Sequence, residues 1–189
     1  MANKRIILAS ASPRRKELLA KIIKKFKIVP SRIDESKIKA KSPAVLALKT
    51  ALAKANDVAA QQPKAIVIGA DTIVVLGKMI IGKPKNKKDA VRILKSLSGK
   101  THKVITGLAV VDTAKQRINA TYVVTKVKMK KVKENAILDY VDSGRPLDKA
   151  GGYGIQEIEE MFIDRIDGDY DNVVGLPVIA LKKLIQKLS

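Results

Sequence analysis

Apolar positions in this chain recur first at the spacing of a strand and then at the spacing of a helix. Ile6–Leu8 forms a short apolar run, and after a serine-rich turn the apolar positions return three and four residues apart, at Leu18, Leu19, Ile22 and Ile23. This pattern predicts a strand, a tight loop and a helix over Pro13–Lys25. Ser12 suits the N-cap, and Pro13 suits the first helical position because its missing N–H would have no partner there.

The same spacing predicts the other elements of the chain. Strands are expected at Phe26–Val29, Ala65–Gly69, Ile73–Leu76, Val104–Val111, Tyr122–Met129 and Met161–Ile166, and helices at Pro43–Ala60, Lys87–Leu97, Ala136–Val141 and Pro177–Leu188. Gly77–Lys83 predicts a hairpin, and the glycine-rich Ala150–Gly154 predicts a flexible loop. Strands and helices mix without strict alternation or repeats, which favours an α/β fold with a mixed, twisted sheet.

Length and composition favour a single globular protein. The chain has 189 residues, 46% of them hydrophobic, so we expect one domain over 1–189. Cysteine is absent and His102 is the only histidine, which excludes disulfides and thiolate sites and disfavours zinc. The first apolar run is broken at Pro13 too early for a secretory signal, and no run is long enough to cross a membrane. We expect a cytoplasmic protein.

The formal net charge of +20 raises the question of nucleic-acid binding. Residues 1–126 hold 28 Lys and Arg against 7 Asp and Glu, whereas residues 127–189 hold 10 against 11. Much of the excess is lysine at helical spacing, and aromatic residues make up only 3%, too few for a base-stacking platform. A solvated lysine-rich surface without specific nucleic-acid affinity is favoured, and a basic nucleic-acid-binding module is the alternative to an enzyme.

Two stretches carry candidate chemistry. Arg14 and Arg15 stand in the first turn of the predicted helix, where free N–H groups and the helix dipole favour an anion, although an isolated capped helix with solvent-facing arginines explains the same residues. Asp71 interrupts two apolar runs, and a buried carboxylate there needs a partner. That partner is a metal in a functional site, or the backbone or a lysine in a structural one.

Eight short motifs then appear in one order from Leu8 to Pro177: LASASPRR, DE, AKA, GADTIV, IIGKP, LSGKTHKVITG, AGGYGIQ and NVVGLP. On these motifs the chain closely resembles the Maf family of nucleoside triphosphate pyrophosphatases. The resemblance implies the Maf and inosine-triphosphatase-like fold, an elongated mixed sheet with flanking helices and two lobes around a nucleotide cleft. It also implies hydrolysis between the α and β phosphates with Mg²⁺ or Mn²⁺.

When the functional residues of the family are transferred by position, the resemblance implies that Asp71 is the general base and that Glu35 and Asp71 bind the metal. The triphosphate site would then comprise Ser10, Arg14, Arg15, Glu35, Lys54 and Lys83. Such an assignment suits an in-line attack, which needs a base near the water and cations on the leaving pyrophosphate.

Substrate choice within the resemblance rests on Arg15, Thr72 and Gln156, which mark the branch that acts on dTTP and UTP, with modified pyrimidine nucleotides as further candidates. After Gln156 the family commonly continues with glycine and small residues, whereas this chain has Glu157, Glu159 and Glu160. These carboxylates either weaken nucleotide binding or face solvent.

Two further expectations come from the family alone. Its members often form dimers, although no stretch of this sequence identifies an interface. The family is also associated with septum formation and arrest of cell division, so a regulatory protein acting through a partner is a third hypothesis. The sequence does not separate that role from a consequence of nucleotide hydrolysis.

Overall fold

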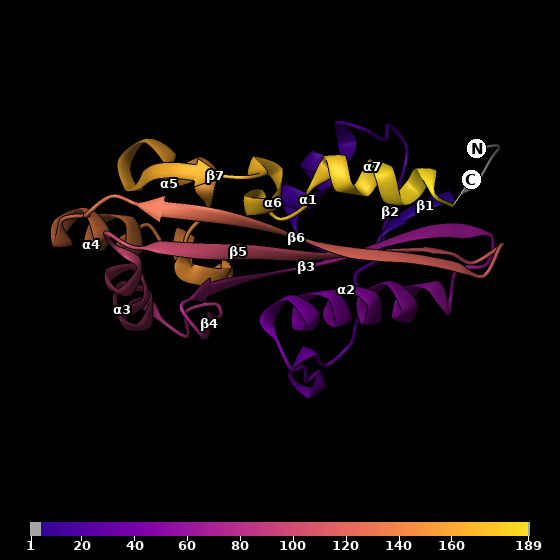
Figure 1. Ribbon diagram of the computed structural model, residues 1–189, viewed down its shortest axis with the longest axis horizontal. Helices are drawn as coiled ribbons and strands as arrows, with labels where there is room; N and C mark the ends of the chain where they lie inside the picture. Colours follow the sequence, from indigo (N-terminus) through magenta and orange to yellow (C-terminus); the bar gives the residue numbers. More distant parts are fainter. Residues whose placement is uncertain (1–4, 189) are drawn as a thin grey trace. The chain divides into compact units, whose positions relative to one another are not determined.

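Three long strands form the framework of the protein (Figure 1): β3 (Ala65–Leu76), β5 (Thr101–Asp112) and β6 (Arg117–Met129). The computed structural model describes residues 5–188, so the outermost residues of the predicted domain lie outside it. The four shorter strands of this part are β1 (Arg5–Leu8), β2 (Lys27–Ile28), β4 (Met79–Ile81) and β7 (Ile163–Asp167).

The strand order is β2-β1-β3-β5-β6-β7, with β4 paired to β3. The pairs β1–β2 and β1–β3 are parallel, whereas β3–β4 and β6–β7 are antiparallel. The predicted α/β fold with a mixed sheet is therefore confirmed. The chain divides into two compact units, as the predicted two lobes require: the first ends at Thr72 and resumes over 106–123 and from Gly175, and the second comprises Ile73–Ile105 and Val124–Val174.

In the first unit, helix α2 (Pro43–Ala59) covers one face of the strands and α7 (Val178–Gln186) the other, while α1 (Pro13–Ala20) follows β1 (Figure 1). The core between α2 and the sheet consists of alanines and valines together with Ile7, and the many alanines let the helix come close to the sheet. Two strand glycines set this spacing: a Cβ built on Gly69 would lie 2.2 Å from the Ala51 carbonyl oxygen, and one on Gly107 equally close to that of Ala47.

The second unit contains four α-helices within the described residues: α3 (Lys87–Leu97), α4 (Glu134–Asp142), α5 (Ile155–Phe162) and α6 (Tyr170–Val174). Helices α3 and α4 pack together, and the Tyr140 ring meets Phe162 edge-on at 5.7 Å between centroids. Three 3₁₀ turns complete the described elements: η1 (Glu35–Lys37) in the first unit, and η2 (Arg145–Asp148) and η3 (Ala150–Gly152) in the second.

Several predicted elements change in extent. The first helix ends at Ala20 and not at Lys25, because the chain must turn there to return as β2 alongside β1. The two apolar runs around Asp71 are one continuous strand, β3. The strand expected from Met161 begins only at Ile163, because the preceding residues form α5, whose buried side chains at Ile155, Ile158 and Phe162 have helical spacing.

The segment expected to be a flexible loop is instead the buried turn η3 with Tyr153 and Gly154 after it. The Gly151 N–H donates to the Gly82 carbonyl at 3.0 Å, and the Gly152 N–H donates to the Lys149 carbonyl at the same distance. Gly151 and Gly152 have φ values of +74° and +70°, which favour glycine. Backbone bonds and burial thus hold this segment in one conformation.

His102 of β5 is buried, and its Nε2 lies 2.6 Å from the Tyr153 hydroxyl. Burial lowers the pKa of His102 to about 4, compared with about 6.5 in an unfolded chain. The folded state therefore favours neutral His102, so this contribution to stability is complete above the unfolded pKa and is lost as the pH falls. We expect the free energy of unfolding to drop by about 2 kcal/mol between roughly pH 7 and 5 from this residue.

Urea titrations at the two pH values measure this loss. The variant His102→Phe, which has no titrating ring, should show a smaller drop. An equal drop in both proteins would mean that other groups cause the pH dependence.

Candidate functional site

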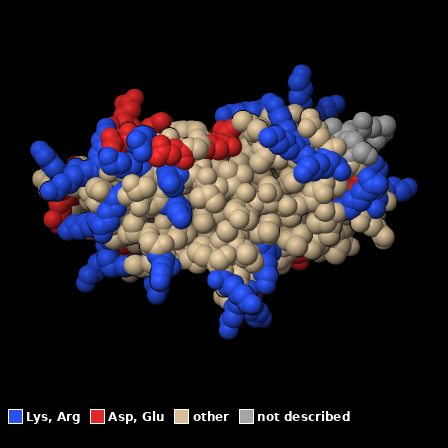
Figure 2. Space-filling model, viewed as in Figure 1, with Lys and Arg blue, Asp and Glu red and all other residues tan. Residues whose placement is uncertain are grey.

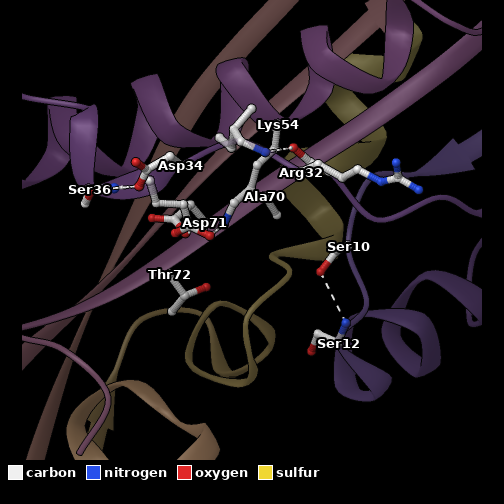
Figure 3. Close-up of polar contacts among 12 residues, drawn as sticks. Ser10, Ser12, Arg32, Asp34, Ser36, Lys54, Ala70, Asp71 and Thr72 are labelled. Carbon is white, nitrogen blue, oxygen red and sulfur yellow. Dashed lines mark hydrogen bonds and ion pairs between the residues drawn. The ribbon is translucent and has the colours of Figure 1, made fainter. Parts of the chain in front are cut away.

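Polar residues of the first unit gather where strand β3 runs on beyond its parallel partner β1. The β1–β3 pairing ends at Leu8 and Ile68, so Gly69–Thr72 extend past the end of β1. The chain leaves β1 through Ala9 and enters α1 at Pro13. Ligands of α/β proteins commonly bind outside the carboxyl ends of parallel strands, and these elements place several polar side chains there (Figure 3).

Lys54 of α2 connects the two predicted carboxylates. Its Nζ lies 2.8 Å from Asp71 Oδ1 and 2.9 Å from Glu35 Oε1. The side chains of Lys54 and Asp71 are each only 12% exposed, whereas that of Glu35 is 55% exposed. The largely buried pair of Lys54 and Asp71 holds its two groups in a fixed geometry. Glu35 is the member of the cluster that is exposed to solvent. The lysine partner of Asp71 fits both the functional and the structural hypothesis for that residue.

The carboxylates of Glu35 and Asp71 are also the only predicted metal ligands. Both reach the same nitrogen, so the two carboxylates lie close together. Within residues 5–188 no group of three or more His, Cys, Asp or Glu side chains is placed to hold an ion. Two carboxylates suit Mg²⁺ bound together with substrate phosphates and water, which needs no complete protein cage. The donor set therefore fits the predicted metal.

Arg15 is bonded to the protein itself through all three of its nitrogens. Nε donates to the Gly175 carbonyl at 2.9 Å, and Nη1 donates to the Ala70 carbonyl at 3.0 Å and to Ser10 Oγ at 3.1 Å. Nη2 donates to Thr72 Oγ1 at 3.0 Å. Four of the five N–H bonds of the guanidinium are thus directed to protein acceptors, and Arg15 joins α1, β3 and the segment before α7.

The charge of Arg15 acts on the same carboxylates. Burial lowers the pKa of Arg15 from its ordinary value, and the Asp71 and Glu35 carboxylates oppose that shift. These three groups therefore interact electrostatically, although Arg15 makes no direct ion pair with either acid among the described contacts.

The start of α1 has the predicted cap. Ser12 Oγ accepts from the Arg15 N–H at 3.5 Å, and Pro13 occupies the first turn. Ser10 is buried, and its Oγ accepts from the Ser12 N–H at 3.3 Å as well as from Arg15. Both acceptor positions of Ser10 are occupied, so its hydroxyl hydrogen remains as a donor for an anion. Arg14 is half-buried in the same turn.

Successive residues of β3 direct their side chains to opposite faces of the sheet. Gly69 faces α2, so Asp71, two residues further, faces α2 as well and meets Lys54. Thr72 faces the other side, where its Oγ1 bonds to Arg15 and lies 3.0 Å from Thr106 Oγ1. The predicted catalytic group and the predicted base-selecting group are thus adjacent in sequence on opposite faces of one strand.

The remaining predicted residues belong to the second unit. Lys83 is exposed after β4, and Gln156 is exposed in the first turn of α5. Their roles stay predictions from the resemblance. Two residues of the first unit were not predicted: Thr106, which lies beside Thr72, and Gly175, which receives Arg15. The motif NVVGLP, which contains Gly175, and the motif LSGKTHKVITG, which contains Thr106, were the available signals.

These observations define a class of protein. It is an α/β protein in which a lysine joins two carboxylates and an arginine fixes the start of the first helix. The chain belongs to the Maf family, because the protein-family model described as "Maf-like protein" matches residues 5–188. A protein of Aquifex aeolicus named "dTTP/UTP pyrophosphatase" is 44% identical over 185 residues, covering 98% of this chain and 96% of the relative. A protein of the same name from Alkaliphilus metalliredigens is 50% identical over 184 residues, covering 97% and 95%.

A solved structure, that of a HAM1 protein from Coxiella burnetii, has the same fold. It aligns with a TM-score of 0.51 at 14% sequence identity, covering 98% of this chain and 100% of the other. This agrees with the predicted inosine-triphosphatase-like architecture. Among residues 5–188, none of the helices combines the length and the apolar character needed to cross a bilayer.

Proposed function

We propose that this chain is a nucleoside triphosphate pyrophosphatase that converts dTTP and UTP to the nucleoside monophosphate and pyrophosphate. The single observation that carries the proposal is the cluster in which Lys54 holds Asp71 and Glu35 beside the end of β1. Support comes from the relatives named "dTTP/UTP pyrophosphatase" and from the substrate-marking residues Arg15, Thr72 and Gln156. We also propose that the protein acts in the cytoplasm, where nucleoside triphosphates are available to it.

In the proposed reaction Asp71 accepts a proton from the water that attacks the α phosphorus, and pyrophosphate leaves. Lys54 orients the Asp71 carboxylate through their 2.8 Å contact. Ser10 donates its hydroxyl hydrogen to the phosphates, and Arg14 contributes positive charge. A role for Lys83 toward the phosphates rests on the resemblance alone. Glu35 and Asp71 would hold Mg²⁺ or Mn²⁺, which neutralises phosphate charge when bound.

The test is the release of pyrophosphate from a panel of nucleoside triphosphates with added Mg²⁺ or Mn²⁺. We expect monophosphate and pyrophosphate in equal amounts, with dTTP and UTP ranked above CTP, ATP and GTP. Separation of the products by anion exchange identifies the bond that breaks. Nucleoside diphosphate with inorganic phosphate, or no product at all, would rule out the proposal.

The basic surface supports the nucleic-acid alternative less well. On the face shown in Figure 2, lysine and arginine side chains project in several separate groups. Among the lysines of residues 5–188, Lys87 is paired with Asp142 at 2.9 Å and Lys95 with Glu134 at 2.6 Å. Scattered and partly paired lysines give general attraction to polyanions and no defined track for a nucleic-acid backbone.

A further inference from the structure

Glu157 is the first of the acidic residues after Gln156, where the chain departs from its family. Each of its two carboxylate oxygens contacts another side chain of the second unit. Glu157 Oε2 accepts from the Tyr140 hydroxyl at 2.7 Å, and Glu157 Oε1 lies 3.2 Å from Lys149 Nζ. The side chain of Lys149 is 7% exposed and that of Glu157 is 26% exposed. The first of the three carboxylates therefore does not face solvent as a free charge.

These contacts enclose the glycine loop that precedes α5. The Tyr140 hydroxyl accepts from the Gly154 N–H at 3.2 Å while it donates to Glu157. A Cβ built on Gly154 would lie 2.8 Å from Lys149 Cε and 3.0 Å from Glu157 Cδ, so these two side chains pack closely against the Gly154 backbone. We call Tyr140, Lys149 and Glu157 the loop clamp.

The clamped loop is also bonded to the segment that carries Lys83. The Gly151 N–H donates to the Gly82 carbonyl, one residue before Lys83. Tyr153, in the same loop, is held by His102 of β5. The loop from Lys149 to Gly154 thus connects the segment of one predicted substrate residue, Lys83, with the first turn of α5, where Gln156 stands.

We propose that Glu157 is a positioning residue for substrate selection: held by Lys149 and Tyr140, it fixes the loop and so the direction from which Gln156 presents its amide to the base. This proposal rests on the proposed function. The amide carries a donor and an acceptor, and uracil and thymine offer the opposite pattern of N–H and carbonyl to that of cytosine. A firmly held glutamine matches one pattern, whereas a loosely held one can turn its amide over and match either.

The experiment compares Glu157→Ala and Glu157→Gln with the matched control Glu160→Gln. Glu160 lies one turn further on α5, is exposed, and donates or accepts nothing through its carboxylate in the described contacts. We expect E157A to lower the ratio of kcat/KM for UTP over CTP about tenfold, mainly through KM, with kcat for UTP changed less than about twofold. E157Q, which keeps an acceptor for Tyr140, should lower the ratio by about threefold, and E160Q should leave it unchanged.

An unchanged ratio in E157A, or an equal loss on both nucleotides, would overturn the selective role. Amide hydrogen exchange provides a readout that does not depend on activity. The Gly154 N–H should exchange at least about tenfold faster in E157A than in E160Q, because its acceptor Tyr140 loses its own partner. Equal exchange in the two variants would refute the clamp itself.

These measurements separate the two proposals. If the wild-type protein releases no pyrophosphate from any nucleotide, the proposed function and the selective role of Glu157 both fail. Faster exchange at Gly154 in E157A would then still establish the clamp as a device that orders the loop. If the wild type is active and the UTP preference survives E157A, only the inference about Glu157 fails.

Discussion

Replacement of Asp71 by asparagine is expected to lower pyrophosphate release from UTP by about a thousandfold, since a positioned general base contributes factors of this order. Asparagine has nearly the same shape and can still accept a hydrogen bond from Lys54 through its amide oxygen, so the fold should persist. It cannot take a proton from water, and it is a poorer ligand for Mg²⁺. Steady-state kinetics at saturating metal, with circular dichroism and Tm of the variant, measure the effect.

The matched control is Asp139→Asn, which removes the same charge from an exposed position on α4. It should retain activity within about twofold, as surface changes away from a site usually do. Raising the metal concentration distinguishes the two roles of Asp71. Full recovery in excess Mg²⁺ would assign Asp71 to metal binding alone, and activity of Asp71→Asn equal to that of the control would remove it from the site.

Replacement of Arg15 by methionine is expected to lower the free energy of unfolding by about 3 kcal/mol, because buried acceptors then lose their donors. The carbonyls of Ala70 and Gly175 and the hydroxyl of Thr72 all receive hydrogen bonds from this guanidinium. Methionine keeps most of the length of the side chain, so the change chiefly removes hydrogen bonds. Urea denaturation measures the loss.

The control for this change is Lys16→Met on the same helix, which is exposed and should change stability by less than about 0.5 kcal/mol. Kinetics of Arg15→Met then address its role toward substrate. Lower stability with equal losses on all nucleotides would make Arg15 a positioning residue for Ser10 and Thr72. A changed ranking of nucleotides with unchanged stability would contradict the structural role of Arg15. It would instead indicate that Arg15 contacts the base of the substrate directly.

Elements with local start and stop signals were predictable from the sequence. The helix Lys87–Leu97 has the predicted bounds because Asn86 caps it by accepting from the Asp89 N–H and Ser98 ends it. Ser42 likewise caps α2 and Pro43 fixes its first turn. These signals act between residues three or four apart, so a sequence pattern contains them in full.

Features that depend on distant residues were not predictable in the same way. Asp71 looked like a break between two strands, yet β3 continues through it, because Lys54 of a preceding helix supplies the partner that the carboxylate needs. The contact of Arg15 with Gly175 spans 160 residues, and no spacing rule predicts it. The motifs predicted which residues belong to the site, and the tertiary contacts add which of these residues are bonded to one another.

The close approach of α2 to the sheet has a consequence for any attempt to improve this protein. Substituting alanine for glycine is a common route to a more heat-resistant enzyme. At Gly69 the added methyl would meet the Ala51 carbonyl and push the helix outward. Lys54 stands one turn beyond Ala51, so its ammonium would withdraw from Asp71 along with the helix. The absence of a side chain at Gly69 is therefore what lets Lys54 reach Asp71.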